Sequence, residues 1–190
     1  MILIMKEAFP LVMRIKKEPT GKFSKWEVGE LVLARRDEEG GTYSIKKLKT
    51  DMLALTSCMA FVPRSYLEKV PCRNISFMLT QPQVKTKTKD VTRRDGWEHL
   101  KKGDILWGVE KGQGLKKGEK IQRMALIRVV DARREPLERM FNEFLYGLAE
   151  CNREGFPNLH PEQFIEMFCS SHKGCKRETQ ITRIEFEYLT

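Results

Sequence analysis

Residues 85–97 read KTKTKDVTRRDGW, and the centre of this stretch is KDVTRR at 89–94. An apolar run, ISFML at 75–79, precedes it, and LKKGDILW at 100–107 follows it; both flanking runs are predicted to contain strands. A lysine, a threonine three residues later and two arginines thus lie between two apolar strands. Three interpretations fit this pattern: a solvated basic loop, a phosphate clamp, or an active site in which an amine activates a hydroxyl.

The composition is that of an ordinary globular protein, with 190 residues, 41% of them hydrophobic and 32% charged. No apolar run approaches the roughly 18 residues of a membrane-spanning helix, and the first residues lack the features of a signal peptide. Five cysteines, an odd number without a secretory signal, favour a reducing compartment. We therefore expect a cytoplasmic protein with no membrane partner.

The net charge of +9 is unevenly distributed along the chain. Residues 85–128 carry 13 Lys and Arg against 6 Asp and Glu, a net charge of +7, whereas residues 1–73 carry +5 and residues 129–190 carry −3. Trp97 and Trp107 lie within the most basic part, and aromatic faces stack on bases while cations hold phosphates. We therefore expect an anionic partner, RNA, DNA or a nucleotide, through the 85–128 region, with solvated surface lysines as the alternative.

The N-terminal part is predicted to be a small β module. Residues 11–15, 30–36 and 42–48 have the apolar and β-branched content of strands, and DEEGG at 37–41 is a hairpin signal. Short strands separated by polar turns favour an SH3-like module over residues 1–72, with a binding role and a structural role both open.

Residues 73–190 are predicted to form a second domain, and the whole chain an α+β fold that is mainly β. The predicted elements are strands at 105–109, 121–130 and 182–189, and helices beginning at Pro136 and Pro161, where proline suits the first turn. The basic, glycine-rich loop at 111–120 is not a Walker A loop, because the Gly-Lys-Ser/Thr ending is absent.

Residues 73–189 resemble an ASCH domain, a PUA-like β-barrel family. The matching features occur in order: the strand ISF at 75–77, the K-x-x-T-x-R core at 89–94, the LKKGD turn at 100–104, a central strand, EGF at 154–156, a Phe-rich helix and the terminal strand RIEF at 183–186. The resemblance implies a PUA-like barrel with flanking helices.

Small members of this family are similar to N4-acetylcytidine amidohydrolases, which cleave an acyl group from the exocyclic amine of cytidine with a Lys, a Thr and a Glu. By motif position, the resemblance implies catalytic roles for Lys89, Thr92 and Glu154. Other relatives are described as ribonucleases or RNA-binding modules. This chain has Lys87 where the family often has Gly, and Asp90 where it often has Thr; a carboxylate beside Lys89 would favour the protonated amine.

Amide hydrolysis needs a nucleophile, a proton acceptor and a proton donor for the leaving amine. The Thr92 hydroxyl is a nucleophile only with a base in hydrogen-bond reach, and Lys89 is that base if burial, or the nearby Arg93 and Arg94, lower its pKa. Glu154 is then the proton donor. Arg94 or a backbone amide can stabilise the oxyanion. A water positioned by Lys89 and Glu154 is the alternative nucleophile.

Each of these residues also has a plain structural interpretation. Taken singly, Thr92 is more often a turn hydroxyl and Glu154 a surface acid, and only their combination favours a site. Arginine pairs are most often solvated or face phosphate, and tryptophans are more often core residues. The residues that we expect to contact substrate or nucleic acid are Lys87, Arg93, Arg94 and Trp97.

A zinc site is the remaining candidate. Cys169-x-x-His172-x-x-Cys175, with Cys151 as a fourth ligand, has a spacing that can ligate zinc. The two separated ligand pairs of common zinc modules are missing, however. We therefore favour buried thiols and a capping histidine, and expect no cofactor.

The first hypothesis is thus an amidohydrolase acting on N4-acylated cytidine or a related acylated nucleoside. A non-catalytic RNA- or DNA-binding module and a ribonuclease are the alternatives. The three differ in their tests. A binding module loses affinity steeply as salt rises, an amidohydrolase acts on a lone nucleoside, and a ribonuclease needs a polymer.

Overall fold

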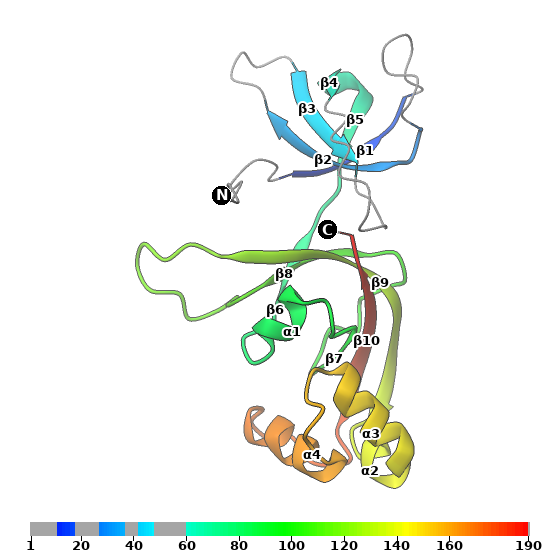
Figure 1. Cartoon of the computed structure of the whole chain (residues 1–190), viewed down its shortest axis with the longest axis vertical. Helices are drawn as coiled ribbons and strands as arrows, with labels where there is room; N and C mark the ends of the chain where they lie inside the picture. The colour runs from blue at the N-terminus through cyan, green and yellow to red at the C-terminus, as the bar shows by residue number, and fades with distance from the viewer. Residues whose placement is uncertain (1–10, 18–26, 37–41, 48–59, 190) are drawn as a thin grey trace. The chain divides into compact units, whose positions relative to one another are not determined.

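The structure is a computed structural model of the chain, and it describes residues 11–17, 27–36, 42–47 and 60–189. The chain divides into two compact units, Met1–Cys72 and Arg73–Leu189 (Figure 1). The hairpin turn predicted at 37–41 lies outside the described residues.

The first unit contains an antiparallel five-stranded sheet in the order β4-β3-β2-β1-β5. Its strands are β1 Leu11–Ile15, β2 Leu31–Arg36, β3 Thr42–Lys47, β4 Ala60–Pro63 and β5 Leu67–Lys69, with the 3-10 turn η2 Arg64–Tyr66 before the last. The side chains of the apolar cluster alternate along β1 and β2, as expected of a covered face. The cluster consists of Met13, Ile15, Val32, Ala34, Ile45 and Leu67. Val12 of β1 is buried as well.

The second unit contains a mixed five-stranded sheet in the order β6-β8-β9-β10-β7, in which only β6 and β8 are parallel. Its strands are β6 Arg73–Ser76, β7 Val91–Arg94, β8 Ile105–Val109, β9 Arg123–Pro136 and β10 Gln180–Tyr188. The long strands β9 and β10 bend, so that the sheet curls into a half-barrel (Figure 1).

One face of this sheet is covered by the short helix α1, Gln81–Lys85. Val84 of the helix packs into a core that includes Phe77 and Phe186. Gly108 makes room for this packing, since a Cβ at that position would lie 3.1 Å from the Phe77 ring. The glycine therefore sets the position of Phe77.

Three further helices gather beyond one end of β9 and β10 (Figure 1). They are α2 Arg139–Asn142, α3 Phe144–Arg153 and α4 Pro161–Ser170. Their apolar faces form a separate core with Leu137 and Ile181. Gly147 permits the close approach of α3, because a Cβ there would lie 1.9 Å from the Met140 carbonyl oxygen.

The predicted class, α+β and mainly β, is confirmed. The secondary structure of KDVTRR at 89–94 was left open, and in the structure Val91–Arg94 pairs with β10 as strand β7. One detail of the prediction was wrong. No helix begins at Pro136: the chain stays paired with Gln180 of β10 up to that residue, and a short α2 and a longer α3 follow. Among the described residues, no helix has the length and apolarity to cross a bilayer.

Candidate active site

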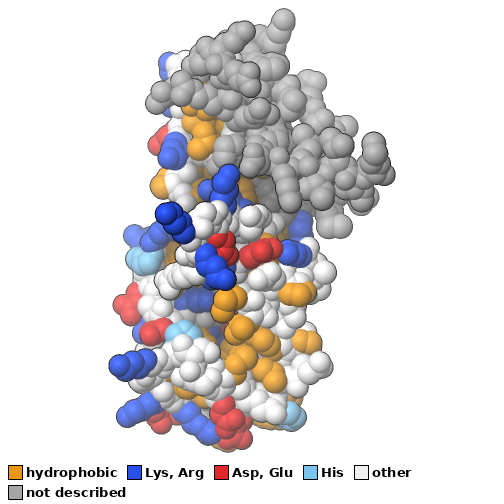
Figure 2. Space-filling model, turned by 90° about the vertical axis from the view of Figure 1, so that its left-hand side faces the viewer, with side chains coloured by type: hydrophobic (Ala, Val, Ile, Leu, Met, Phe, Trp, Pro, Cys, Tyr) orange, Lys and Arg blue, Asp and Glu red, His pale blue; other side chains and the backbone are white. Residues whose placement is uncertain are grey.

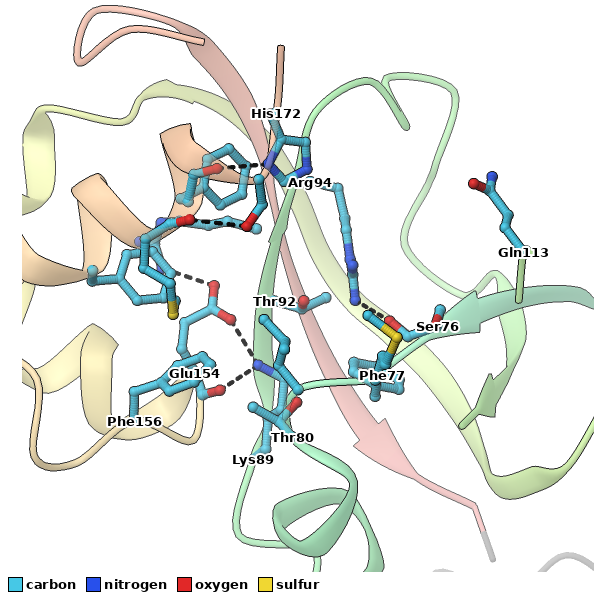
Figure 3. Close-up of a pocket in the computed structure, with 17 residues that line it drawn as sticks. Ser76, Phe77, Thr80, Lys89, Thr92, Arg94, Gln113, Glu154, Phe156 and His172 are labelled. Carbon is cyan, nitrogen blue, oxygen red and sulfur yellow. Dashed lines mark hydrogen bonds and ion pairs between the residues drawn. The ribbon is translucent and has the colours of Figure 1, made fainter. Parts of the chain in front are cut away.

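A cavity of about 410 Å³ opens in the second unit, beside β7 and the ends of α3 and α4 (Figure 3). Its wall combines ionisable groups with apolar side chains, as small-molecule sites commonly do. The lining residues used below are Ser76, Phe77, Lys89, Thr92, Arg93, Arg94, Gln113, Glu154, Phe156, Ser171 and His172. The structure thus brings Lys89, Thr92 and Glu154 to one cavity.

Lys89 and Glu154 form a buried ion pair. The distance from Lys89 Nζ to Glu154 Oε2 is 2.7 Å, and the two side chains are only 2% and 4% exposed. Lys89 Nζ also donates to the backbone carbonyl of Glu154. Burial lowers the pKa of Lys89, and the charges of Arg94 and Arg93 act in the same direction, against the raising effect of Glu154.

Glu154 is positioned by the way in which α3 ends. Glu154 is the C-cap, and Gly155 follows with a φ of +86°. Phe156 N donates to the Cys151 carbonyl at 2.8 Å, and Gly155 N to the Asn152 carbonyl at 2.9 Å, which is a Schellman motif. The EGF sequence at 154–156 is therefore a helix stop that presents the carboxylate of Glu154 to the cavity.

The same helix end holds Lys89. The Asp90 backbone N–H donates to the Arg153 carbonyl at 3.2 Å, and the Tyr188 hydroxyl donates to the Lys89 carbonyl at 2.6 Å. The Lys89 ammonium, bonded to the Glu154 carbonyl, also lies where a cation interacts favourably with the α3 dipole.

The carboxylate of Asp90 is not a partner of Lys89, contrary to what its place in the sequence suggested. It pairs with Arg153 instead, at 2.7 Å from Nη2 to Oδ2. The fixed pairing removes the expected effect of Asp90 on the Lys89 amine.

Arg93 is buried in a network that sequence reasoning missed. Its Nη2 lies 2.7 Å from both Glu135 Oε1 and Glu150 Oε2, and its Nη1 lies 3.3 Å from Glu154 Oε1. Burial lowers the pKa of Arg93, but the charges of Glu154, Glu150 and Glu135 outweigh it, so that the pKa is raised. Because its Nη atoms bind three carboxylates, Arg93 is fixed in place and in turn holds the carboxylate of Glu154.

Glu150 connects Arg93 to a second arginine. Arg183 Nε and Nη2 donate to the two Glu150 oxygens at 2.6 and 2.8 Å. Burial raises the pKa of Glu150, but the hydrogen bonds from Arg183 and the charge of Arg93 prevail and lower it to about 2. A glutamate between two arginines from different strands carries no local sequence signal.

Thr92 is buried in β7, opposite Ile184 of β10. Its hydroxyl makes no hydrogen bond to the described part of the chain, and Lys89 Nζ is directed to Glu154 instead (Figure 3). The three predicted catalytic residues thus share the cavity, but the expected contact between Lys89 and Thr92 is not formed in this arrangement.

Arg94 also lines the cavity, and it is bound less completely than Arg93. Its Nη2 donates to the Ser76 carbonyl, and its guanidinium lies 5.5 Å from the centre of the Phe77 ring. Burial lowers its pKa, against the raising effect of the Glu154 charge. No carboxylate among the described residues forms an ion pair with it.

Lys87 and Trp97, the other predicted contacts, do not line this cavity. Lys87 Nζ lies 5.9 Å from the centre of the Tyr188 ring. Trp97 packs against the sheet core and lies over His99, with ring centroids 5.9 Å apart. Both residues have positive φ angles, 60° and 63°, and so mark tight turns on either side of β7.

The candidate zinc ligands are brought together only in part. Cys169 Sγ and Cys175 Sγ are 3.1 Å apart as free thiols, and His172 Nδ1 lies 2.8 Å from the Phe168 carbonyl. Cys151 is buried in the helical core. Within the described ranges, no group of three or more His, Cys, Asp and Glu side chains is arranged to hold a metal ion.

No protein-family model matches the chain, and no curated protein matches it. Among solved structures, the crystal structure of the hypothetical protein PH0355 is similar, with a TM-score of 0.44 and 14% identity over 62% of this chain and 99% of that chain. A similarity of this degree identifies neither a shared fold nor a shared activity.

Proposed function

We propose that the protein is an amidohydrolase that removes an acyl group from the exocyclic amine of N4-acylated cytidine or a related nucleoside. The buried Lys89–Glu154 pair on the wall of a cavity that also contains Thr92 carries this proposal. We further propose a PUA-like ASCH fold for residues 73–190, supported by the curled sheet, and an SH3-like fold for residues 1–72, supported by its five antiparallel strands.

The pair suits acid–base chemistry because one proton lies between two groups that are both removed from water. Burial lowers the pKa of Lys89 and so favours its neutral amine, the form that can accept a proton, and Glu154 lies 2.7 Å away as the partner that can exchange a proton with it. One buried pair then supplies both the base and the acid that amide cleavage requires.

In the proposed reaction the Lys89 side chain turns from Glu154 to Thr92 and accepts the hydroxyl proton as Oγ1 adds to the acyl carbon. The bond from carbon to nitrogen breaks as Glu154 gives its proton to the exocyclic nitrogen, which leaves as the amine of cytidine. Water then cleaves the threonine ester and releases the carboxylic acid. Each proton transfer of this kind contributes on the order of 100-fold to the rate, or more.

The test is hydrolysis of N4-acetylcytidine, followed by loss of its absorbance, with Lys89→Met, Thr92→Val and Glu154→Gln in parallel. We expect turnover by the unmodified protein and a loss of at least about 100-fold in each variant. Lys85→Met is the matched control, since Lys85 pairs with Glu110 at the same 2.7 Å on the surface. Acetylated Thr92, detected by mass spectrometry after rapid quenching, distinguishes threonine from water as the nucleophile. Absence of turnover by a folded, unmodified protein contradicts the proposal.

A second candidate function is nucleic-acid binding, favoured by a set of exposed lysines in the 85–128 region. These are Lys85, Lys87, Lys101, Lys102, Lys116, Lys117 and Lys120. Figure 2 shows Lys and Arg side chains next to hydrophobic ones on one face of the described chain. Binding of this kind weakens steeply with salt, because counterions are released. Affinity for RNA that falls with salt and survives Lys89→Met would support this role, whereas cleaved RNA would indicate a ribonuclease.

A further inference from the structure

Arg94 is the cavity residue whose charge is not balanced by any carboxylate among the described residues. The buried groups around the reacting pair match in number when Lys89 is protonated: Lys89, Arg93 and Arg183 face Glu135, Glu150 and Glu154. Arg94 adds a further positive charge, and none of the described carboxylates forms an ion pair with it. Arg94 is only partly exposed to water, and a cation that is partly buried without a carboxylate partner is costly.

The guanidinium of Arg94 also keeps donors free. Five N–H groups are available on an arginine. One Nη2 hydrogen is used by the Ser76 carbonyl, while Nε is buried without a partner. Nη1 has no hydrogen-bond partner in the described part of the chain. The contact with Ser76 and the Phe77 ring fixes the plane of the group, so the free edge is pre-oriented rather than mobile.

Other polar groups on the same cavity wall are compatible with an anion. Gln113 lines the same wall and offers an uncharged donor. The acidic side chain on the cavity wall is Glu154, and it is bound to Lys89 and Arg93.

We propose that Arg94 binds a negatively charged group of the substrate, so that the preferred substrate is an acylated cytidine derivative that carries anionic oxygens. This inference rests on the proposed function, since it takes Lys89, Thr92 and Glu154 as the reacting centre. Thr92 and Arg94 are two residues apart on β7, and their side chains leave the same face of the strand, roughly 7 Å apart. The anion therefore lies near the reacting amide but apart from it.

Two sources supply such oxygens: a phosphate on the ribose, or a carboxylate at the far end of the acyl group. An arginine fork binds either in two parallel hydrogen bonds. The substrates that separate them are N4-acetylcytidine, N4-acetylcytidine 5′-monophosphate and N4-succinylcytidine.

The experiment measures kcat/KM for these three compounds in the unmodified protein, Arg94→Met, Arg94→Lys and Arg128→Met. The last is the control, because Arg128 pairs with Glu187 at the surface and does not line the cavity. The readout is the preference of each protein for the anionic compound over the neutral one, so a loss common to all substrates cancels.

We expect one anionic compound to be preferred at least about tenfold by the unmodified protein, an energy within the range of one charge-assisted hydrogen bond. The ratio of kcat/KM for the anionic compound to kcat/KM for the neutral one falls to about one in Arg94→Met. It is partly kept in Arg94→Lys and unchanged in Arg128→Met. The compound preferred identifies the source of the anion. Equal use of all three compounds, or a preference that survives Arg94→Met, overturns the inference.

If the unmodified protein hydrolyses none of the compounds, the proposed function fails but this subsite is still testable. The same compounds are then stable ligands, and their dissociation constants are measured by calorimetry with the same four proteins. Tighter binding of an anionic compound that depends on Arg94 supports the subsite, whereas equal affinities overturn it.

Discussion

Lys89 and Glu154 are both buried, and they are joined by an ion pair. The pair is 2.7 Å long, and so is the surface pair Lys85–Glu110, which differs mainly in being 54% and 34% exposed. The chain therefore contains a buried and an exposed ion pair of the same type and length. Comparison of the two pairs tests the effect of burial, together with the Arg93 contact that Glu154 also makes.

Removal of one member of the buried pair leaves an unpaired polar group in the interior. We expect Glu154→Gln to lower the free energy of unfolding by about 3 kcal/mol, and Glu110→Gln to lower it by less than about 1 kcal/mol. Urea unfolding of both variants checks this. The double variant Lys89→Met, Glu154→Leu should recover much of the stability without recovering hydrolysis. Equal effects of Glu154→Gln and Glu110→Gln would show that the pair is solvated.

Glu150 couples stability to acid pH. Its pKa falls from the ordinary 4.5 to about 2 on folding, so the unfolded chain binds the proton more tightly. Its contribution is present above pH 4.5 and is lost as the pH falls towards 2, and amounts to about 3 kcal/mol. Unfolding midpoints measured from pH 6 to pH 2 should fall less steeply in Glu150→Gln, which starts from a lower stability. Parallel pH profiles would contradict this assignment.

The end of α3 is the element on which the site depends, since one Schellman turn orients Glu154 and receives Lys89. Gly155 has a φ of +86°, and a Cβ there would lie 3.1 Å from Gln83 Cγ in α1. The turn is thus constrained both by its backbone angle and by the neighbouring helix.

Gly155→Ala should therefore lower the free energy of unfolding by more than the strain of the positive φ angle alone would. We expect a loss of about 2 kcal/mol in unfolding free energy, from left-handed strain and crowding together, and a marked loss of hydrolysis. Gly103→Ala is the matched control, because its φ is +92° and a Cβ there meets nothing within 4 Å. Its cost should be about 1 kcal/mol with activity kept. Denaturant unfolding and kcat are measured on both variants. Equal losses of stability and activity in the two would show that the contact with Gln83 does not matter.

The sequence predicted elements best where the signal is local. Strands β1, β2, β3, β8, β9 and β10 were predicted from their apolar pattern, and the helix after Pro161 from its apolar residues, whereas β4 and β5 were not predicted as strands. The prediction was wrong at Pro136, where pairing across the chain decides the structure, because this residue ends a strand that pairs with β10. Pairing with β10 also makes the segment around Thr92 a strand, which the sequence alone had left open.

The site was predictable to a similar extent. The residues Lys89, Thr92 and Glu154 were proposed from motif order, and the structure places them at one cavity. Glu135, Glu150 and Arg183 lie far apart in the sequence and meet only through the fold. Carboxylates and arginines at such separations look like surface residues until their burial is known.

At the scale of the whole molecule, every residue that lines the cavity belongs to Arg73–Leu189. We expect residues 73–190, produced alone, to fold cooperatively and to keep the hydrolytic rate of the whole chain within about twofold, since that unit has its own core. Circular dichroism on heating and assay with N4-acetylcytidine check this. An unfolded fragment would show that the first unit is needed for the stability of the second.

The thiols of Cys169 and Cys175 are close enough for a disulfide to form between them under oxidising conditions. Their sulfurs are 3.1 Å apart, and His172 and Ser171 of the cavity wall lie in the segment between them. A small-molecule disulfide such as oxidised glutathione accepts two electrons from the two thiols, leaving one intramolecular cross-link and two reduced thiols. Burial and the Cys175 contact raise the pKa of Cys169 to about 11, so we expect this reaction to be slow at neutral pH and faster in alkali. Formation of the cross-link is measured as the loss of two maleimide-reactive thiols, a loss that we do not expect in Cys175→Ser. A change in the rate of hydrolysis on cross-linking would show that oxidation of these thiols alters the cavity.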